Sequence, residues 1–212
     1  MTLTVVCVLW VGAFEDRHYS PAWVTRLRDQ VAAQLPIPHR FLCLSNVDVP
    51  GVETRRLTTD WPGWWAKLEI FNPAHALVGR VLYLDLDVFV TGNLAPIVTY
   101  PAPIALMPPS HLFADLRPRD LPGVVRRYQG SCIVFDPPAG RELFDECDPA
   151  VRAGFRSDQD WIGARLPACE TMPAAWFAKA RQCRAGVPPD VRLVLAHRVS
   201  LLGRELADVA AS

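Results

Sequence analysis

The chain has 212 residues, with 22 basic and 22 acidic side chains and a hydrophobic fraction of 50%. This length suits one α/β domain, and the composition is that of a globular protein rather than a disordered one. A formal net charge of zero gives no electrostatic reason to expect a nucleic acid or an anionic membrane as partner. The chain has no run of about 18 apolar residues, so we expect no transmembrane helix.

The amino terminus and the cysteines indicate the compartment. The opening residues, MTLTVVCVLWVGAF, contain an apolar run, but no basic residue precedes Arg17 and no small-residue cleavage site follows, so we interpret them as a strand rather than a signal peptide. The six cysteines form no C-x-x-C pair and lie mostly in apolar segments. We therefore expect buried free thiols and a cytoplasmic protein.

Apolar runs predict the strands of one domain over residues 1–212. They are nearly continuous, which is typical of strands covered on both faces, and they lie at residues 3–11, 39–45, 80–85, 131–136 and 191–197. Helical segments separate the first three runs, and this alternation favours right-handed βαβ units. We predict an α/β fold with a doubly wound, mostly parallel sheet and helices on both faces.

Three of the predicted helices have recognisable start or stop signals. In the first, Ser20 and Pro21 suit the N-cap and the first helical position. Its apolar residues fall on one helical face: Val24, Leu27, Val31 and Leu35. The second, GWWAKLEIF at residues 63–71, must end or bend at the Asn-Pro pair that follows it. In the third, SDQDWI, Ser157 is the predicted N-cap.

Two aspartates follow the most apolar strand, in the sequence RVLYLDLDVFVTGNL. Ligands bind beyond the carboxyl ends of strands in doubly wound sheets. In an extended backbone Asp85 and Asp87 would point to the same side, with Cα atoms about 6–7 Å apart. Two such carboxylates repel unless a cation lies between them. We therefore predict Mg²⁺ or Mn²⁺, shared with a diphosphate. The alternative is that the acids only cap the turn that follows.

A second enzyme class also places D-x-D after a strand. Haloacid-dehalogenase-like phosphatases use the first aspartate as nucleophile and the second as general acid, which here would be Asp85 and Asp87. Their fold starts near the motif and needs a later lysine. In this chain two βα units precede the motif, and the one downstream lysine, Lys179, lies in AAWFAKARQC, which we interpret as helical.

The order of the motifs resembles a known family. VVCVLW, the helix that follows Ser20, GWWAKLEIF, RVLYLDLDVFVTGNL, GSCIVFD and SDQDWI occur in the same order as in GT-A-fold nucleotide-sugar glycosyltransferases. The chain is most similar to bacterial members of glycosyltransferase family 8, over residues 3–165. The resemblance implies a nucleotide-binding half at about 3–107 and an acceptor loop and sugar pocket at 108–212. It also implies transfer from a UDP-sugar to an acceptor, with retention of anomeric configuration by front-face attack.

The resemblance implies donor-binding roles for several residues. Trp10 and Tyr19 would face the base, although Trp10 is equally well explained as a core residue. Lys67 would reach the diphosphate or the sugar, since a point charge suits phosphate. Ser131 would contact the sugar hydroxyls. The donor partner is thus a nucleotide sugar, and the acceptor is not identified.

The resemblance also implies a metal site and a catalytic pair. Asp85 would touch the donor and assist the metal, while Asp87 and His197 would bind the metal directly. Asp158 and Gln159 would lie beneath the anomeric carbon and stabilise positive charge as the glycosidic bond breaks. Each has a structural alternative: a histidine at a strand end is often only hydrogen-bonded, and an acid in the first turn of a helix is favoured by the helix dipole.

Three departures from the family pattern keep a non-catalytic sugar-nucleotide binder open as an alternative. Leu9 stands where relatives often have lysine, and Gln129 stands where they have asparagine. No lysine follows His197, where only Arg198 or Arg204 offers a cation. The segment 108–130 has the composition of a loop or lid. Residues 200–210, SLLGRELADVA, predict a small amphipathic helix that packs on the sheet or on the second subunit of a homodimer.

Overall fold

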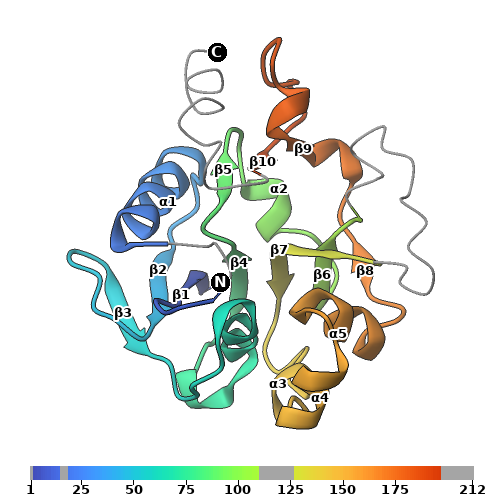
Figure 1. Ribbon diagram of the computed structural model, residues 1–212. Coiled ribbons are helices and arrows are strands. Elements are labelled where there is room, and N and C mark those ends of the chain that lie inside the picture. Colours follow the sequence, from blue (N-terminus) through green and yellow to red (C-terminus); the bar gives the residue numbers. More distant parts are fainter. Residues whose placement is uncertain (1, 15–18, 110–126, 197–212) are drawn as a thin grey trace.

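The computed structural model describes residues 2–14, 19–109 and 127–196 (Figure 1). His197, the predicted helix at 200–210 and most of the predicted lid at 108–130 lie outside the described residues. Of the arginines in the lid segment, Arg127 is described, and its Nη1 donates to the Pro167 carbonyl at 2.8 Å. No helix within the described ranges is both long and apolar enough to span a bilayer.

A seven-stranded sheet forms the centre of the molecule, in the order β3-β2-β1-β4-β7-β6-β8. Its strands are β1 (Leu3–Leu9), β2 (Arg40–Ser45), β3 (Glu53–Arg56), β4 (Arg80–Leu84), β6 (Ile104–Met107), β7 (Gln129–Phe135) and β8 (Glu170–Thr171). Every neighbouring pair is parallel except that β7 runs antiparallel to both β4 and β6. The predicted mostly parallel α/β sheet is confirmed, with β7 as the strand of opposite direction.

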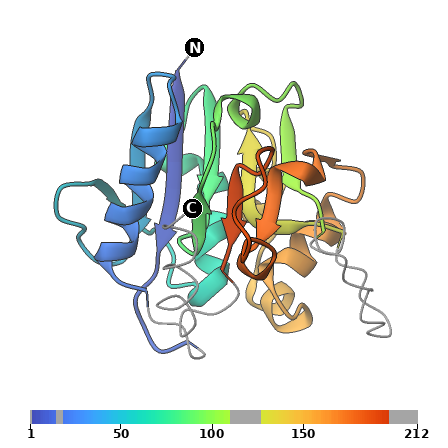
Figure 2. The ribbon, with the colours of Figure 1, turned by 90° about the horizontal axis from the view of Figure 1, so that it is seen from above.

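Helices cover both faces of this sheet. Figures 1 and 2 show α1 (Pro21–Gln34) and the group α3 (Glu142–Asp145), α4 (Pro149–Gly154) and α5 (Asp158–Arg165) on opposite sides of the molecule. Along β1, Val5 and Cys7 belong to the core on the α1 side, and Val6 to the core beneath α5. This alternation follows from the pleat of a strand, and it explains why the predicted run had no polar face.

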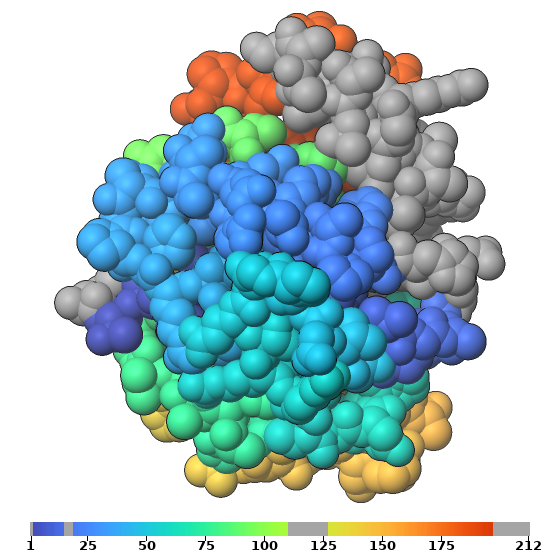
Figure 3. Space-filling model, turned by 90° about the vertical axis from the view of Figure 1, so that its left-hand side faces the viewer, coloured from blue at the N-terminus to red at the C-terminus, as the bar shows by residue number. Residues whose placement is uncertain are grey.

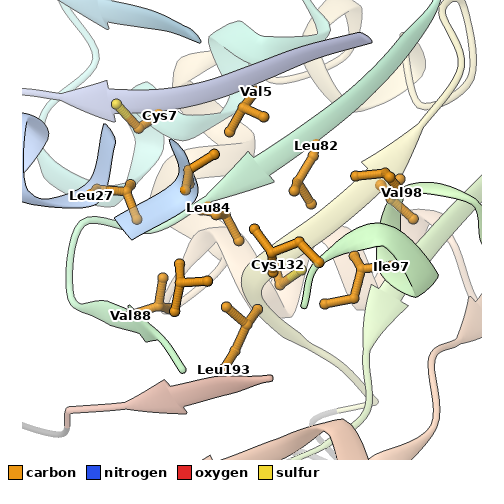
Figure 4. Close-up of a cluster of buried hydrophobic side chains, with 14 of the residues drawn as sticks. Val5, Cys7, Leu27, Leu82, Leu84, Val88, Ile97, Val98, Cys132 and Leu193 are labelled. Atoms are coloured by element: carbon orange, nitrogen blue, oxygen red, sulfur yellow. The ribbon is translucent and has the colours of Figure 1, made fainter. Parts of the chain in front are cut away.

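The core on the α1 side joins segments that are far apart in the sequence. Figure 4 shows Val5, Leu27, Leu84, Val88 and Leu193 in one cluster, together with residues of α2 (Ala95–Val98). Each of these five side chains is fully buried. Burying one such side chain contributes about 1.5–3 kcal/mol. The predicted buried thiols are also confirmed, because all six cysteines are free and Cys169 alone is partly exposed.

The helix after Ser20 is confirmed. Ser20 is the N-cap of α1 with an extended backbone, although its side chain makes no capping hydrogen bond, and Pro21 is the first residue. Figure 3 shows the blue surface of α1 above the cyan surface of the segment around β3. The buried side chains of α1 are those that its periodicity predicts: Val24, Leu27 and Val31, with Leu35 buried at the C-cap.

The segment GWWAKLEIF forms a 3₁₀ helix, η1 (Gly63–Phe71), rather than an α-helix. It ends where the Asn-Pro pair predicts, and the short η2 (Pro73–His75) follows. Seven of the nine residues in η1 are buried. A segment enclosed on most sides has its backbone set by packing rather than by helix propensity, which explains the difference.

The last predicted strand is shorter than expected and belongs to a second sheet. β10 (Leu193–Leu195) lies between β5 (Val88–Val90) and β9 (Phe177–Lys179), not in the main sheet. The helical interpretation of AAWFAKARQC is wrong, because Lys179 ends strand β9 between the 3₁₀ turns η3 (Ala174–Trp176) and η4 (Ala180–Gln182). Pairing with β10, a distant segment, overrides the local propensity.

A buried carboxylate anchors η1. Glu69 is fully buried and accepts hydrogen bonds from Thr58 N at 2.9 Å, Thr59 N at 2.6 Å, the hydroxyls of both threonines and His75 Nε2 at 2.7 Å. Burial alone would raise the pKa of Glu69, but the hydrogen bonds from His75 and the threonines outweigh it and lower the pKa to about 2. The carboxylate therefore stays ionised and holds η1 to the loop that precedes it.

We predict that Glu69→Gln lowers the free energy of unfolding by about 2–4 kcal/mol at pH 7. Because the folded pKa is depressed, the unfolded state binds more protons, and this contribution is complete only above the unfolded pKa of about 4.3. It is lost as pH falls toward the folded value of about 2. Urea unfolding from pH 7 down to pH 2.5 checks this.

The difference in stability between wild type and Glu69→Gln should shrink across that window. Glu170→Gln, at an exposed position, is the matched control and should change the stability by less than about 0.5 kcal/mol at every pH. A difference between wild type and Glu69→Gln that stays constant from pH 5 to pH 2.5 would contradict the assignment.

Candidate functional site

A cavity of about 600 Å³ lies at the carboxyl ends of β1 and β4. The chain leaves β1 toward β2 and β3, then returns to β4 on the other side of β1, so this is the point where strand order switches. Ligands bind at such points in open α/β sheets. Three separate parts of the chain supply most of the lining: the segment after β1, the turn after β4 and the start of α5.

A buried lysine joins two carboxylates at the floor of the cavity. Lys67 Nζ lies 2.8 Å from Asp158 Oδ2 and 3.1 Å from Asp85 Oδ1. Lys67 is 5% exposed and Asp158 2%. Burial lowers the pKa of Lys67, but the charges of Asp158 and Asp85 outweigh it and raise the pKa. Asp158 is also the first residue of α5, where the helix dipole favours a carboxylate. The three groups therefore form a charged cluster.

Tyr83 also holds Asp85, through the same carboxylate oxygen that Lys67 contacts at 3.1 Å. Its hydroxyl donates to Asp85 Oδ1, and the Asp85 backbone N–H donates to the Ser131 carbonyl at 3.0 Å. Burial and the neighbouring Asp85 carboxylate both raise the pKa of Tyr83, so its hydroxyl keeps the proton that it donates. Sequence reasoning missed Tyr83, although two residues apart on one strand point to the same side.

The start of β7 lies against the charged cluster. A Cβ on Gly130 would lie 3.1 Å from Lys67 Nζ and 3.4 Å from Asp158 Oδ2, so a side chain there would press on the ion pair. Ser131 follows Gly130 and is 7% exposed, but its side chain is outside the set of residues that line the cavity. A contact between Ser131 and a sugar stays a prediction.

The backbone turns after Asp85 instead of staying extended. Residues Leu86 and Asp87 form a turn, and Val88 N donates to the Asp85 carbonyl at 3.4 Å. Asp85 and Asp87 nevertheless line the same cavity. Tyr19 Oη donates to Asp87 Oδ2 at 3.2 Å, so the predicted donor residue Tyr19 contacts the second aspartate directly. Asp85 and Asp87 thus lie beside the same cavity, as predicted, but a turn rather than an extended strand places them there.

The lining residues fit a hard divalent cation by their chemistry. Three carboxylates, at Asp85, Asp87 and Asp158, stand against two cations, Lys67 and Arg156, which gives the described lining a formal charge of −1. Carboxylate oxygens with phosphate oxygens as further ligands are what Mg²⁺ and Mn²⁺ accept. The described residues contain no group of three potential ligands, and the predicted third ligand, His197, lies beyond them.

Aromatic rings form another wall of the cavity. Trp10 and Phe14 have ring centroids 6.1 Å apart, and Phe14 and Trp64 have centroids 4.6 Å apart, both edge to face. Gly63, with φ +58°, leaves room for Phe14, whose ring would lie 2.1 Å from a Cβ at that position. The sequence predicted Trp10 as a lining residue, but Phe14 and Trp64 were missed, because only the fold brings their two segments together.

The start of α5 completes the site. Ser157 is the N-cap, as predicted, and its hydroxyl accepts from Asp160 N at 3.4 Å. Asp158 and Gln159 both line the cavity, as the resemblance implied. Gln159 Oε1 is buried and accepts no hydrogen bond from the described residues. Arg156 is exposed at the same end of the cavity and was missed, since nothing in the sequence distinguishes it from other arginines.

Comparison with known proteins identifies the fold. No family model and no curated protein sequence matches the chain. A crystal structure of the galactosyltransferase LgtC with donor and acceptor sugar analogues superposes with a TM-score of 0.62 at 13% identity, over 92% of this chain and 87% of that one. An active-site mutant of LgtC, in which glutamine is replaced by glutamate, superposes at 0.61 with 11% identity and the same coverage. The fold is the GT-A-like fold of LgtC. The predicted resemblance is thereby confirmed at the level of fold.

The ion pairs of Lys67 give a prediction that does not depend on any ligand. Lys67→Met leaves two carboxylates without their cation, Asp158 buried and Asp85 four-fifths buried, and we expect the free energy of unfolding to fall by about 3–5 kcal/mol. Adding Asp158→Asn removes one of those charges and should restore part of the loss. Urea unfolding of both single variants and the double variant measures the coupling energy.

An exposed pair provides the control for this cycle. Asp48→Asn breaks the ion pair between Asp48 and Arg56, in which the Asp48 side chain is 86% exposed and the Arg56 side chain 58% exposed. This substitution should leave the free energy of unfolding almost unchanged. Additive effects of Lys67→Met and Asp158→Asn would show that the buried pair is not coupled as its geometry requires.

Proposed function

We propose that the protein is a glycosyltransferase that moves a sugar from a UDP-sugar to an acceptor, with Mn²⁺ or Mg²⁺ as cofactor and with retention of anomeric configuration. One observation carries the proposal: Asp85 and Asp87 converge with Asp158 and Gln159, more than 70 positions along the chain, on one 600 Å³ cavity in a GT-A-like fold. The fold is also the argument against the dehalogenase-like phosphatase, whose chain would begin near Asp85.

The nucleotide half of the donor fits the aromatic wall and the aspartates of the cavity. The aromatic side, with Trp10 and Tyr19, suits a flat base, since aromatic side chains present large apolar faces. The diphosphate then lies over Asp87, and Asp85 meets the ribose or the sugar. His197 stays a predicted further ligand of the metal. A bound Mn²⁺ or Mg²⁺ would supply neutralisation of the departing diphosphate.

The sugar half of the donor falls between Lys67, Asp158 and Gln159. Lys67 Nζ lies 2.8 Å from Asp158 and 3.1 and 3.4 Å from the two oxygens of Asp85, so its positive charge is shared with both carboxylates beside the donor sugar. The Asp158 carboxylate presents negative charge where the anomeric carbon becomes positive, and Gln159 Oε1, which accepts no hydrogen bond from the described residues, presents partial negative charge there. LgtC, which has the same fold, has a glutamine in its active site. Ser131 would complete the contacts to the sugar hydroxyls.

A sugar-nucleotide binder without turnover remains the second candidate. It is favoured by the pairing of Lys67 with two carboxylates, which leaves Arg156 as the one lining cation, within the described residues, that has no carboxylate partner. The binder is also favoured because Leu9 replaces a lysine of the family pattern and because no lysine follows His197. The acceptor, the cytoplasmic location and a homodimer stay predictions under either function.

Ligand binding to the folded state provides the first test. We expect Mn²⁺ and UDP together to raise the melting temperature more than either alone, by about 5–10 °C when UDP is 100-fold above its dissociation constant. A screen of sugar nucleotides with Mn²⁺ should then find one that is slowly hydrolysed. Asp87→Ala should abolish both the rise in melting temperature and the hydrolysis of the sugar nucleotide. Asp29→Ala, on the exposed face of α1, should keep both.

The outcomes separate the candidate functions. Stabilisation without hydrolysis of any sugar nucleotide would favour the binder, and no stabilisation by any nucleoside diphosphate would rule out the donor site. An aspartyl-phosphate mimic trapped at Asp85 would support the phosphatase instead.

Gln159 gives a prediction about the chemical step. If Gln159 Oε1 stabilises charge at the anomeric carbon, Gln159→Ala should lower kcat on the order of 10²-fold. The dissociation constant of UDP with Mn²⁺ should not change, because the base and diphosphate contacts are made by other residues. Steady-state hydrolysis and calorimetric titration measure the two quantities. An equal loss in UDP affinity would assign Gln159 to ground-state binding.

A further inference from the structure

One arginine of α1 contacts the backbone on both sides of Asp87. Arg26 Nη2 donates to the carbonyl of Leu86 and, at 3.2 Å, to the carbonyl of Val88. These two residues flank Asp87 in the chain. Arg26 is not among the residues that line the cavity, so it contacts the turn from outside the cavity.

The guanidinium is enclosed by aromatic rings. Arg26 Cζ lies 4.8 Å from the centroid of the Trp23 ring and 4.1 Å from that of Phe89. Its Nε and Nη1 are buried and have no hydrogen-bond acceptor among the residues that the structure describes. Burial lowers the pKa of Arg26 to about 10, opposed by the nearby charge of Asp87. The side chain therefore remains charged at neutral pH.

Such a guanidinium is costly to bury, because two of its three nitrogens lose their hydrogen bonds to water. An apolar side chain would fill the space between two rings without that cost. Within the described residues, the side-chain hydrogen bonds of Arg26 go to Leu86 in the turn and to Val88, the first residue of β5. What the arginine adds, beyond packing, is a fixed position for this turn.

Other residues of α1 hold the same segment. Trp23 and Arg26 lie on one face of the helix with Gln30, whose Oε1 accepts from Val90 N at 3.3 Å. Trp23 also packs edge to face against Tyr19, at 5.4 Å, and Tyr19 donates to Asp87. Figure 1 shows α1 beside β5, the strand into which the turn runs. Residues of α1, together with Tyr19 just before it, thus contact the turn at Asp87 and the strand β5 that follows it.

We propose that Arg26 is a positioning residue: it holds the backbone on either side of Asp87 so that this carboxylate faces the cavity and the cation of the donor site. The inference rests on the proposed function, in which Asp87 binds Mn²⁺ or Mg²⁺. Outer partners that orient a metal ligand typically change metal affinity by about 10–100-fold when they are lost.

The charge of Arg26 and its role in positioning predict opposite changes in Mn²⁺ affinity when Arg26 is replaced, so one measurement distinguishes them. Arg26→Met removes a positive charge near Asp87, and by Coulomb's law that alone would tighten the binding of a cation. It also removes the donor to Leu86 and Val88, which would release the turn. If positioning dominates, the dissociation constant of Mn²⁺ rises by about 10-fold in Arg26→Met, against the direction of the charge effect.

The experiment measures Mn²⁺ binding rather than turnover. Free Mn²⁺ is followed by electron paramagnetic resonance during titration of the protein in saturating UDP, alongside thermal unfolding of each variant. Arg80→Met is the control, because Arg80 likewise has a guanidinium that donates to two backbone carbonyls, those of Val98 at 3.1 Å and Ala102 at 2.9 Å, but lies at the other end of β4. Arg80→Met should lower the melting temperature and leave the Mn²⁺ dissociation constant unchanged.

Each outcome decides for or against the inference. Mn²⁺ binding that is unchanged or tighter in Arg26→Met overturns it, and so does an equal loss of affinity in Arg80→Met. Arg26→Lys keeps the charge and one donor, so it should lie between wild type and Arg26→Met. If Arg26→Met does not fold, an unchanged dissociation constant in Arg26→Lys overturns the inference. Wild-type protein that binds no Mn²⁺ with UDP would remove the proposed donor site itself, and this inference with it.

Discussion

The structure of the site depends on one buried positive charge, the ammonium group of Lys67 between Asp158 and Asp85. Two carboxylates this close, one buried and the other four-fifths buried, would repel each other and carry a large desolvation cost without a cation between them. The lysine comes from η1, Asp85 from the end of β4 and Asp158 from the first turn of α5. The ammonium group of Lys67 therefore joins three elements at the carboxyl edge of the sheet.

The two aspartates of the D-x-D motif are held by different parts of the fold. On the side of η1, the carboxylate of Glu69 fixes the helix that carries Lys67, and Lys67 in turn fixes Asp85. On the side of α1, hydrogen bonds from Arg26 and Tyr19 hold the turn at Asp87. The first carboxylate, Asp85, is thus held by the charge of Lys67, and the second, Asp87, is held by a hydrogen bond from Tyr19 and through the backbone on either side of it. This division suits a site in which one acid meets the sugar and the other meets the cation.

Local patterns predicted the parts of the fold that local forces determine. Continuous apolar runs gave β1, β2 and β4, and Pro21 with the spacing of Val24, Leu27 and Val31 gave α1. The errors lie where distant segments meet, as in the small sheet that joins β5, β9 and β10. The same limit applies to the site. The D-x-D pair could be predicted from the strand that precedes it. The contact of Lys67 with Asp158 spans 91 positions and the packing of Phe14 on Gly63 spans 49, so no local pattern predicts them.

The charge of the cavity connects the departures from the family pattern to the need for a cation. The described lining already carries a formal charge of −1, and a diphosphate adds at least two more negative charges to it. The family pattern that the sequence resembles has lysines at two positions near the diphosphate, whereas this chain has Leu9 at one of them and lacks a lysine after His197, at the other. Lys67 is already paired with Asp158 and Asp85, so it can offset little of the charge of the donor. Under the proposed function, a divalent ion must therefore offset most of the negative charge of the diphosphate.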